Sequence, residues 1–557
     1  MKNASKYKKH YFMPPNVSTK WIKKHHLEKV PAWCSVDLRD GNQALVVPMS
    51  LSEKLDFFNF LVKIGFKEIE IGFPAASETE YEFCRRLIED GLIPDDVAIQ
   101  VLTQSREHII DKTFKALEGA KNSVVHLYNS TSLAQREQVF KKSKQEIIDI
   151  AVLGANLLKE RAKSTFGNFR FEYSPESFTG TEVEFALEIC NEVLKIWEPS
   201  PENQVIINLP GTVELSLPHV YASQVEYMCD NLYKRENVIV SLHPHNDRGC
   251  AVADAELGLL AGAQRVEGTL FGNGERTGNA DIITLALNLY SHGVDPELDF
   301  EDILKVAKFY EDITDMRVHQ RHPYAGELVF AAFSGSHQDA IAKGMEWREQ
   351  KGLYEWSVPY LPIDPKDIGR QYDGDVIRIN SQSGKGGVGY LIKEKYGIDL
   401  PKKLREEVGY IIKDASDKQH KELLADEVYD IFYNNFINVS YPLAFADVRF
   451  VQNDAGFETA NLTVRQKGKE RIFSGKGNGP LDAVVHALRN SLGVKIDIAS
   501  YSEHSLQNSG SSSEALSFME IRDGNGRSFW GVGRDTNSTV SPIYALFSAL
   551  NRSGLIN

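Results

Sequence analysis

Residues 238–247 read Val-Ile-Val-Ser-Leu-His-Pro-His-Asn-Asp, an apolar run that ends abruptly in polar side chains. The β-branched residues of Val238–Leu242 favour a buried strand. A helical stretch, Ala251–Ala261, follows almost at once. A strand with a polar carboxyl end and a helix behind it is the unit from which this chain is built.

The same unit recurs between Pro31 and Val294. Helices are expected at Ser52–Ile64, Glu80–Glu89 and Thr181–Ile196. Eight strands alternating with helices over about 260 residues predict an α/β fold of the (β/α)8 TIM-barrel type. A doubly wound open sheet is the alternative, but no glycine fingerprint follows the first strand. The predicted strands are Ala32–Leu38, Glu68–Phe73, Val97–Leu102, Ser123–Tyr128, Phe169–Tyr173, Val205–Leu209, Val238–Leu242 and Arg265–Phe271.

The end of the chain contains an internal repeat. Arg471-Ile-Phe-Ser-Gly-Lys-Gly477 matches Arg527-Ser-Phe-Trp-Gly-Val-Gly533 at an offset of 56 residues. Each copy is expected to form two strands and a helix (Pro480–Leu492 and Ser541–Leu550), with Ser505–Ser513 as a flexible loop between them. The predicted domains are an N-terminal arm (1–30), a barrel (31–325), helical linker subdomains (326–440) and a C-terminal α+β domain of two ββα repeats (441–557).

Composition excludes several classes of protein. The net charge of −14 argues against a nucleic-acid partner. No run of about 18 apolar residues is present, so no membrane association is expected. The five cysteines form no Cys-x-x-Cys pair, which indicates a reducing, cytoplasmic location. The basic residues near the start lack a following apolar stretch and do not resemble a signal peptide.

His243 and His245 occupy positions i and i+2 at the end of the seventh strand, so their imidazoles share one face. Taken alone, such a pair is more often an ordinary surface or core feature. Here Asp40, in the turn Arg39-Asp40-Gly41 after the first strand, lies close by in a closed barrel and completes a metal-ligand set. These ligands leave Mg²⁺, Mn²⁺, Zn²⁺ and Fe²⁺ open.

Other polar residues lie at the expected carboxyl rim of the barrel. Glu70, His126 and Glu176 could each be a solvated rim residue, but their shared position favours function. After the eighth strand, the glycines of Gly272–Asn279 let the backbone approach a ligand, and Asn279 is suited to cap the next helix. A plain glycine-rich connection is the alternative there.

Ser383-Gly-Lys-Gly-Gly-Val-Gly389 looks like a phosphate-binding loop. Tyr390 and Leu391, however, stand where that motif needs Lys and Ser or Thr. Nucleotide hydrolysis is therefore not expected.

Together, Arg39–Gln43, His243–Asp247 and Gly272–Asn279 resemble the DRE-TIM metallolyase superfamily, and within it the long form of the 2-isopropylmalate synthase family. The resemblance covers nearly the whole chain. Supporting motifs are Glu172–Ser177, Leu209–Glu214, Phe333–Asp339 and the doubled C-terminal unit.

The resemblance implies an acyltransferase that performs a Claisen condensation of acetyl-CoA with 3-methyl-2-oxobutanoate and then hydrolyses the thioester to (2S)-2-isopropylmalate and CoA. This is the first committed step of leucine biosynthesis. The doubled domain resembles a leucine-binding regulatory domain, so leucine is expected as an allosteric inhibitor.

The family's residue roles carry over by motif. Asp40, His243 and His245 would hold the divalent metal, with Asn279 a further contact; Mg²⁺ or Mn²⁺ is expected, and Zn²⁺ stays open. Arg39 would add a positive charge beside the ketone oxygen, oriented by Glu70. His126 and Thr212 would line the oxoacid pocket.

For the proton transfer, the resemblance implies Glu176 and His337 as the base or its relay, with Tyr372 nearby. In the family, residues placed like His337 and Tyr372 reach the active site of the neighbouring subunit, which implies a homodimer.

Three alternatives remain. A citramalate or homocitrate synthase would share the metal and the base and differ in the oxoacid pocket. A retro-aldol lyase of the superfamily would generally lack the doubled domain. A non-catalytic leucine sensor would not need the intact Arg39, Asp40, His243 and His245.

Overall fold

The computed structural model describes residues 3–9, 11–17, 20–331, 335–372, 385–419, 423–452, 458–505 and 513–556. The chain forms two compact units. The first comprises Met1–Val329 with Ile363–Arg370, and the second Phe330–Pro362 with Gln371–Asn557.

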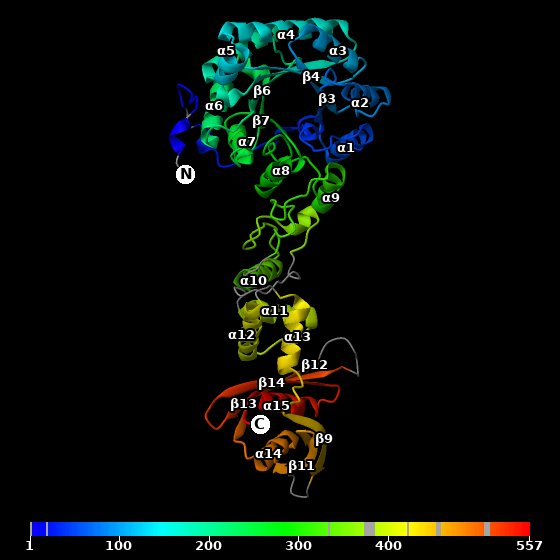
Figure 1. The fold of residues 1–557 in the computed structure, drawn as a ribbon, viewed down its shortest axis with the longest axis vertical. Coiled ribbons are helices and arrows are strands. Elements are labelled where there is room, and N and C mark those ends of the chain that lie inside the picture. The colour runs from blue at the N-terminus through cyan, green and yellow to red at the C-terminus, as the bar shows by residue number, and fades with distance from the viewer. Residues whose placement is uncertain are drawn as a thin grey trace. The chain divides into compact units, whose positions relative to one another are not determined.

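The first unit is a closed parallel barrel in which each strand pairs with the next along the chain and β8 pairs with β1 (Figure 1). The predicted TIM barrel is therefore confirmed. Its strands are β1 (Ala32–Ser35), β2 (Glu68–Gly72), β3 (Ala98–Gln104), β4 (Ser123–Ser130), β5 (Phe169–Glu176), β6 (Val205–Gly211), β7 (Val238–Pro244) and β8 (Arg265–Gly268).

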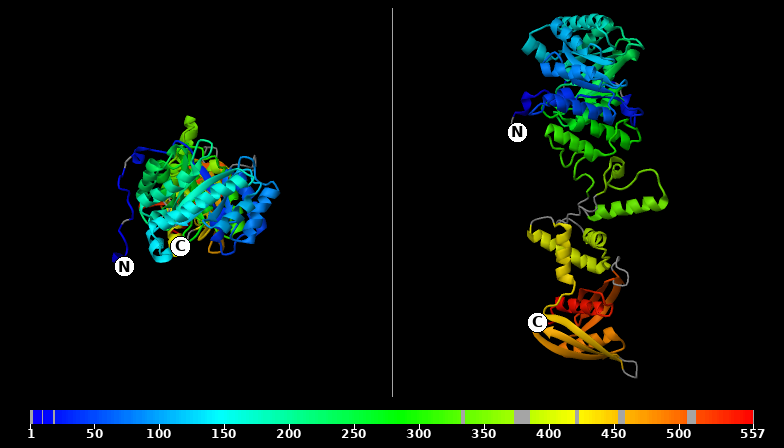
Figure 2. Two further views of the ribbon diagram at one scale, coloured as in Figure 1. Left: turned by 90° about the horizontal axis from the view of Figure 1, so that it is seen from above. Right: turned by 90° about the vertical axis from the view of Figure 1, so that its right-hand side faces the viewer.

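Helices between the strands form the outer layer of this unit (Figures 1 and 2). The first shows how the sequence sets their bounds: Ser50 and Glu53 form a reciprocal capping box at its start, and Gly65 ends it at φ 118°. The helices are α1 (Leu51–Ile64), α2 (Glu78–Glu89), α3 (Glu107–Leu117), α4 (Lys144–Ser164), α5 (Val183–Trp197), α6 (Pro218–Asn231), α7 (Ala251–Leu260), α8 (Ile282–Ser291) and α9 (Ile303–Thr314).

Strands β1 and β8 each end three residues earlier than predicted, and both ends lie at the candidate site. After β1 the chain turns into a π-helical segment, Asp37–Gly41. The Asp37 carboxylate accepts hydrogen bonds from the Ser35 hydroxyl at 2.8 Å and from the Leu270 amide at 3.1 Å. These bonds tie the turn after β1 to the turn after β8, and they place Arg39 and Asp40 at the mouth of the barrel.

The second unit begins with helices α10 (Gly335–Lys351), α11 (Lys385–Tyr396), α12 (Lys402–Gln419) and α13 (Ala425–Phe436). The described part of the glycine-rich 383–389 segment, from Lys385, forms the start of α11. Apolar residues of α11–α13 pack together with Leu516, Phe518, Trp530 and Val532 of the C-terminal sheets.

Each C-terminal repeat contains three strands and a helix, one strand more than predicted. The added strands, β9 and β12, lie at the edges of their sheets. Strand β12 buries only Ile496, so its sequence lacks the alternation of apolar and polar residues from which a strand is predicted. Residues 506–512 of the predicted loop lie outside the described residues. The repeats are β9 (Leu443–Gln452), β10 (Glu458–Gln466), β11 (Lys469–Gly477) and α14 (Pro480–Leu492), then β12 (Ile496–Ser505), β13 (Ala515–Asp523), β14 (Ser528–Asp535) and α15 (Ser541–Arg552).

The repeated Gly-x-Gly motif is explained by helix-to-sheet packing. A Cβ on Gly475 would lie 2.2 Å from the Ala487 nitrogen of α14, and one on Gly531 would lie 2.2 Å from the Ala549 nitrogen of α15. Each helix thus approaches its strand too closely for any side chain. The two repeats bury one shared apolar core.

In the described part of the chain, no helix combines the length and the apolar character needed to cross a membrane.

Gly531→Ala is expected to destabilise the C-terminal repeats by about 1–3 kcal/mol, because α15 has to move away from the sheet. Thermal unfolding of the full chain should show a lower Tm. Gly479→Ala is the matched control, since a Cβ there meets nothing within 4 Å; an equal loss in both variants would contradict the packing argument.

Candidate active site

A cavity of about 200 Å³ opens at the carboxyl ends of the barrel strands. This is the end at which TIM-barrel enzymes place their active sites. Its walls come from β3 to β7 and from the turns after β1 and β8. The lining residues are Arg39, Asp40, Gln43, Leu102, His126, Tyr128, Ser174, Glu176, Asn208, Pro210, Thr212, His243, His245, Glu275 and Arg276.

Asp40, His243 and His245 converge on one point of this cavity, as the sequence predicts. The Asp40 Oδ2 atom lies 3.5 Å from His243 Nε2 and 3.6 Å from His245 Nε2. One ligand atom from each of the three residues lies within 4.8 Å of the others. All three side chains are buried. This spacing suits ligands around a single ion.

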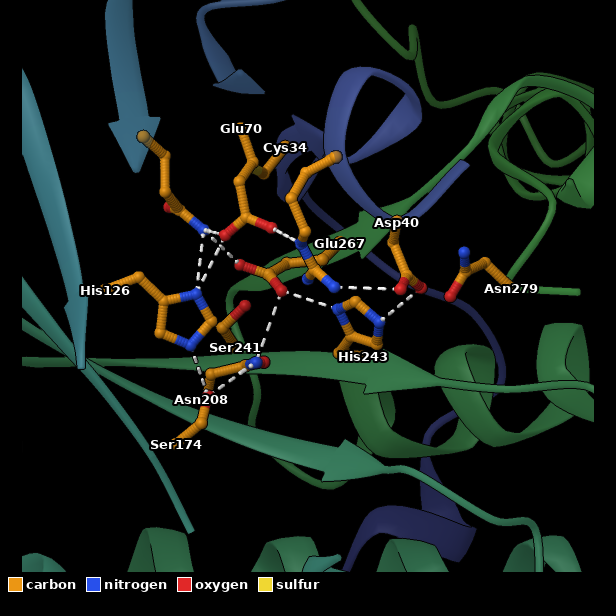
Figure 3. Close-up of polar contacts among 12 residues, drawn as sticks. Cys34, Asp40, Glu70, His126, Ser174, Asn208, Ser241, His243, Glu267 and Asn279 are labelled. Carbon is orange, nitrogen blue, oxygen red and sulfur yellow. Dashed lines mark hydrogen bonds and ion pairs between the residues drawn. The ribbon is translucent and has the colours of Figure 1, made fainter. Parts of the chain in front are cut away.

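Two buried oxygen atoms at this point have no hydrogen-bond partner among the described residues: Asp40 Oδ2 and Asn279 Oδ1. The Asn279 amide nitrogen donates to the Asn273 carbonyl at 3.0 Å, which fixes the amide plane, and Figure 3 shows the Asn279 side chain facing Asp40. Unpaired buried acceptors are costly. A divalent cation would satisfy both, so the donor set fits the predicted metal.

The charges of the three residues differ. Burial raises the pKa of Asp40, but the adjacent Arg39 guanidinium and the imidazoles hold it well below its usual range. Burial and the neighbouring His243 lower the pKa of His245 to about 4. Asp40 is therefore an anion and His245 a neutral imidazole, which are the forms that bind metals.

His243 is held from behind by a residue that the sequence analysis did not single out. Its Nδ1 atom lies 2.7 Å from Glu267 Oε2, and the Glu267 side chain is fully buried. Burial lowers the pKa of His243, yet the nearby carboxylates of Asp40 and Glu267 raise it to about 9. A carboxylate behind a histidine ligand fixes the ring and its tautomer.

Glu267 belongs to a charged network in the centre of the barrel (Figure 3). Arg265, fully buried, donates to Glu68 at 2.6 Å, to Glu267 and Ser241 at 2.8 Å and to Gln100 at 2.7 Å. The Glu172 carboxylate lies 3.4 Å from the same guanidinium. Burial, with Glu267 close by, raises the pKa of Glu172 well above its ordinary value.

The same network reaches Arg39 from the other side. Arg39 Nε donates to Glu70 Oε1, and Arg39 Nη1 donates to Asp40 at 2.8 Å. Glu70 also accepts from Gln100 at 2.7 Å and contacts His126 Nδ1 at 2.8 Å. Burial raises the pKa of Glu70, but Arg39 and His126 bring it down to about 2. Glu70 thus lies behind Arg39 rather than on the cavity wall.

Glu70, His126 and Glu267 also lie close enough together to hold an ion. Their facing atoms, however, already bond to one another or to Gln100. The trio of Asp40, His243 and His245, with its unpaired oxygen, is the better metal site.

The remaining predicted residues fall into two groups. Glu176 and Thr212 line the cavity: Glu176 accepts from the Ser130 hydroxyl, and Thr212 accepts from the Ser177 amide at 2.9 Å. His337 and Tyr372 belong to the second unit, where the His337 ring stacks on Tyr360 with ring centroids 4.1 Å apart. Their catalytic roles stay predictions.

The fold and the site together define a metal-dependent enzyme of the HMGL-like class, and residues 30–309 match the model of that family. Residues 327–393 match the alpha-isopropylmalate synthase post-catalytic domain-like family, and residues 422–553 the LeuA allosteric (dimerisation) domain.

The chain is similar throughout its length to curated relatives. It is 62% identical to the 2-isopropylmalate synthase of Desulfitobacterium hafniense (strain Y51), over 99% of this chain and 98% of the relative. It is 60% identical to the 2-isopropylmalate synthase of Helicobacter hepaticus (strain ATCC 51449 / 3B1), over 98% of this chain and 99% of the relative. The chain belongs to the 2-isopropylmalate synthase family, as the sequence motifs predict.

Asp40→Asn is expected to weaken Mn²⁺ binding by more than about 100-fold, because the change removes the anionic ligand while preserving shape. Titration followed by Mn²⁺ electron paramagnetic resonance measures this directly. Asp56→Asn, on the exposed side of α1, is the control. Unchanged binding in Asp40→Asn would remove this trio as the metal site.

Glu267→Gln is expected to weaken metal binding by about 10- to 100-fold, less than the loss of a direct ligand, because His243 loses the partner that fixes its tautomer. The same titration, paired with thermal unfolding, separates this effect from general destabilisation. Glu188→Gln, exposed on α5, is the matched control. Equal metal affinity in wild type and Glu267→Gln would be inconsistent with a positioning role.

Proposed function

We propose that this chain condenses acetyl-CoA with 3-methyl-2-oxobutanoate and hydrolyses the thioester, releasing 2-isopropylmalate and CoA. The observation that carries the proposal is one small cavity in which a cation-binding trio, the Arg39 guanidinium and the Glu176 carboxylate all meet. Membership of the 2-isopropylmalate synthase family supports it. A citramalate or homocitrate synthase would need a different oxoacid to be preferred.

Asp40, His243 and His245 would hold a divalent cation, Mg²⁺ or Mn²⁺ by preference and Zn²⁺ as a further candidate, with Asn279 Oδ1 as an additional oxygen. When bound, the ion supplies Lewis-acid polarisation of a ketone. The neutral His245 and the ionised Asp40 are ready to act as ligands without a change of protonation.

Arg39 would bind the ketone oxygen and stabilise the negative charge that grows on it. Its guanidinium is fixed on two sides, by Glu70 and by Asp40. Such a preorganised charge in a cavity sheltered from water contributes far more than the same charge in solution. Glu70 acts through Arg39 and is a positioning residue.

The acetyl methyl group must lose a proton before its carbon attacks the ketone carbon. Glu176 is the candidate base on the cavity wall, and the Ser130 hydroxyl orients its carboxylate. We propose His337 and Tyr372 as relay residues contributed by a partner subunit. The resulting alkoxide gains a proton, and water then cleaves the thioester to leave the free acid and the thiol of CoA.

The cavity also suits a branched oxoacid. Leu102 and Pro210 provide apolar wall, while His126 and Thr212 lie on the same surface. His126 is held between Glu70 and the Ser174 hydroxyl, 2.8 and 2.7 Å away. A site fixed in this way can discriminate substrates by the volume of the side chain.

The rest of the chain is assigned by the same reasoning. We propose an N-terminal arm (1–30), a catalytic barrel (31–325), linker subdomains (326–440) and a leucine-binding regulatory domain (441–557) in a cytoplasmic homodimer. The match of residues 422–553 to the LeuA allosteric (dimerisation) domain supports regulation and assembly. The free state of all five cysteines is consistent with a reducing location.

The test is turnover with Mg²⁺ and acetyl-CoA across 3-methyl-2-oxobutanoate, pyruvate, 2-oxobutanoate and 2-oxoglutarate, followed by release of free thiol. 3-Methyl-2-oxobutanoate should give the highest kcat/KM, by about tenfold or more over 2-oxobutanoate, since one methyl group in an apolar pocket changes binding by about 1–3 kcal/mol. Leucine should suppress the reaction. A preference for pyruvate would indicate a citramalate synthase, and one for 2-oxoglutarate a homocitrate synthase.

A further inference from the structure

Three loops form one wall of the catalytic cavity. They follow β6 (residues 212–217), β7 (245–250) and β8 (269–281). Each contributes a residue that lines the cavity: Thr212, His245 and Arg276 in turn. The backbone already joins the first two loops, because the His245 amide donates to the Gly211 carbonyl at 3.1 Å.

The side chain of Arg276 connects all three loops. Its Nε and Nη2 atoms donate to the two carboxylate oxygens of Asp247, in the loop after β7, at 2.7 and 3.2 Å. The same Nη2 atom donates to the Thr212 carbonyl, in the loop after β6. An isolated surface ion pair contributes little to stability, but a guanidinium that binds both oxygens of a carboxylate has a fixed orientation. We call the pair of Arg276 and Asp247 the loop clamp.

The loop clamp holds the chain on both sides of Val213. Arg276 binds the Thr212 carbonyl, and Asp247 Oδ2 accepts from the Glu214 amide at 3.0 Å. The Asp247 side chain is only 17% exposed, so these bonds are largely sheltered from water. The backbone that carries Thr212 is therefore fixed by the two partners of one ion pair.

The backbone of Arg276 itself is in an unusual conformation. Its φ angle is 59°, in the left-handed region that residues with a side chain rarely adopt. Such conformations persist where the surrounding structure holds them, and they concentrate at functional sites. The bonds to Asp247 and Thr212 supply that support.

The Thr212 hydroxyl depends on this backbone for its direction. It accepts a hydrogen bond from the Ser177 amide at 2.9 Å. A hydroxyl that accepts in this way still has its own proton to donate. A shift of the Thr212 backbone would break the bond to Ser177 and turn the hydroxyl away from the cavity.

We propose that Asp247 and Arg276 are positioning residues for the 2-oxoacid, and that the loop clamp keeps Thr212 where its hydroxyl meets that substrate. This inference rests on the proposed function, because it deepens the recognition of the oxoacid in that reaction. The clamp bonds reach the backbone at 212 and 214, whereas the Glu176 carboxylate is oriented by Ser130 on β4.

The first test separates the two substrates. Asp247→Asn keeps the size of the side chain and removes its charge. The KM for 3-methyl-2-oxobutanoate should rise about tenfold, because a charge-assisted bond to Arg276 is lost. The KM for acetyl-CoA and the kcat should stay within about twofold of wild type. Arg276→Gln should show the same split.

A double-mutant cycle tests whether the two residues act as one unit. In Asp247→Asn/Arg276→Gln the oxoacid KM should rise about as much as in either single variant, since independent effects would multiply to about a hundredfold. An unchanged oxoacid KM in Asp247→Asn, an equal rise for both substrates, or a multiplied rise in the double variant would each overturn the proposal.

Asp90→Asn is the matched control. Arg86 Nε donates to Asp90 Oδ2 at 2.7 Å at the end of α2, so the variant breaks the same kind of bond outside the cavity. Both KM values should equal those of wild type. A rise in oxoacid KM equal to that of Asp247→Asn would assign the effect to general destabilisation and contradict the clamp.

Asp247 lies two positions after His245, so metal affinity has to be measured as well. Titration followed by Mn²⁺ electron paramagnetic resonance should show an affinity in Asp247→Asn within about threefold of wild type, below the losses of about 10- to 100-fold expected for partners of metal ligands. A loss as large as that of Asp40→Asn would mean that Asp247 acts through the metal, and it would overturn the proposal.

Hydrogen exchange followed by mass spectrometry tests the clamp without turnover. In Asp247→Asn the amides of residues 212–217 should exchange at least about threefold faster, and those of β4 should be unchanged. If wild type turns over no oxoacid, the proposed function fails; faster exchange at 212–217 would then still support the clamp. Unchanged exchange there would exclude the clamp, whether or not wild type turns over 3-methyl-2-oxobutanoate.

Discussion

The guanidinium of Arg265 lies fully buried at the centre of the barrel, and the rest of the site depends on how its charge is balanced. A buried cation is tolerated only where anions and hydrogen bonds surround it. Glu68 and Glu267 supply the charges, while Gln100 and Ser241 take further hydrogen bonds. Below these residues Ala98, Val124 and Ile206 form an apolar layer. The barrel is therefore filled by an ordered charged network above an apolar base.

Two chains of hydrogen bonds connect this network to the residues of the cavity above it. Glu267 fixes His243 and thereby one side of the metal site. Gln100 bridges Glu267 to Glu70, which fixes Arg39 and His126. His243, Asp40 and the Arg39 charge that would act on the ketone are thus positioned by one connected set of buried bonds. Arg39, His126 and His243, at the cavity wall, therefore owe their orientation to partners one layer down.

Much of this arrangement could be predicted from the sequence. His243, His245 and Asp40 follow apolar runs that predict strands, and a parallel barrel brings the carboxyl ends of its strands together. The buried charged residues beneath the cavity were not predicted, although the sequence contains a pattern that indicates them. Glu172, two positions before Ser174 and four before Glu176, points to the same interior by the period-two rule of a strand. The edge strand β12 was missed for the opposite reason, since a mostly exposed strand carries little apolar alternation. His337 and Tyr372 lie far along the chain, and no local pattern connects them to the barrel.

A charged barrel interior is an expensive way to support a site, because apolar packing of the same volume would often be at least as stable. Its advantage is directional. An apolar core fixes positions by contact alone, whereas the bonds from Arg265 to Glu267 and from Glu267 to His243 fix the direction of a lone pair as well. Metal coordination depends on that direction, and so does the stabilisation of charge on a reacting oxygen. The buried network is best understood as the part of the fold that converts a general α/β barrel into a site with defined chemistry.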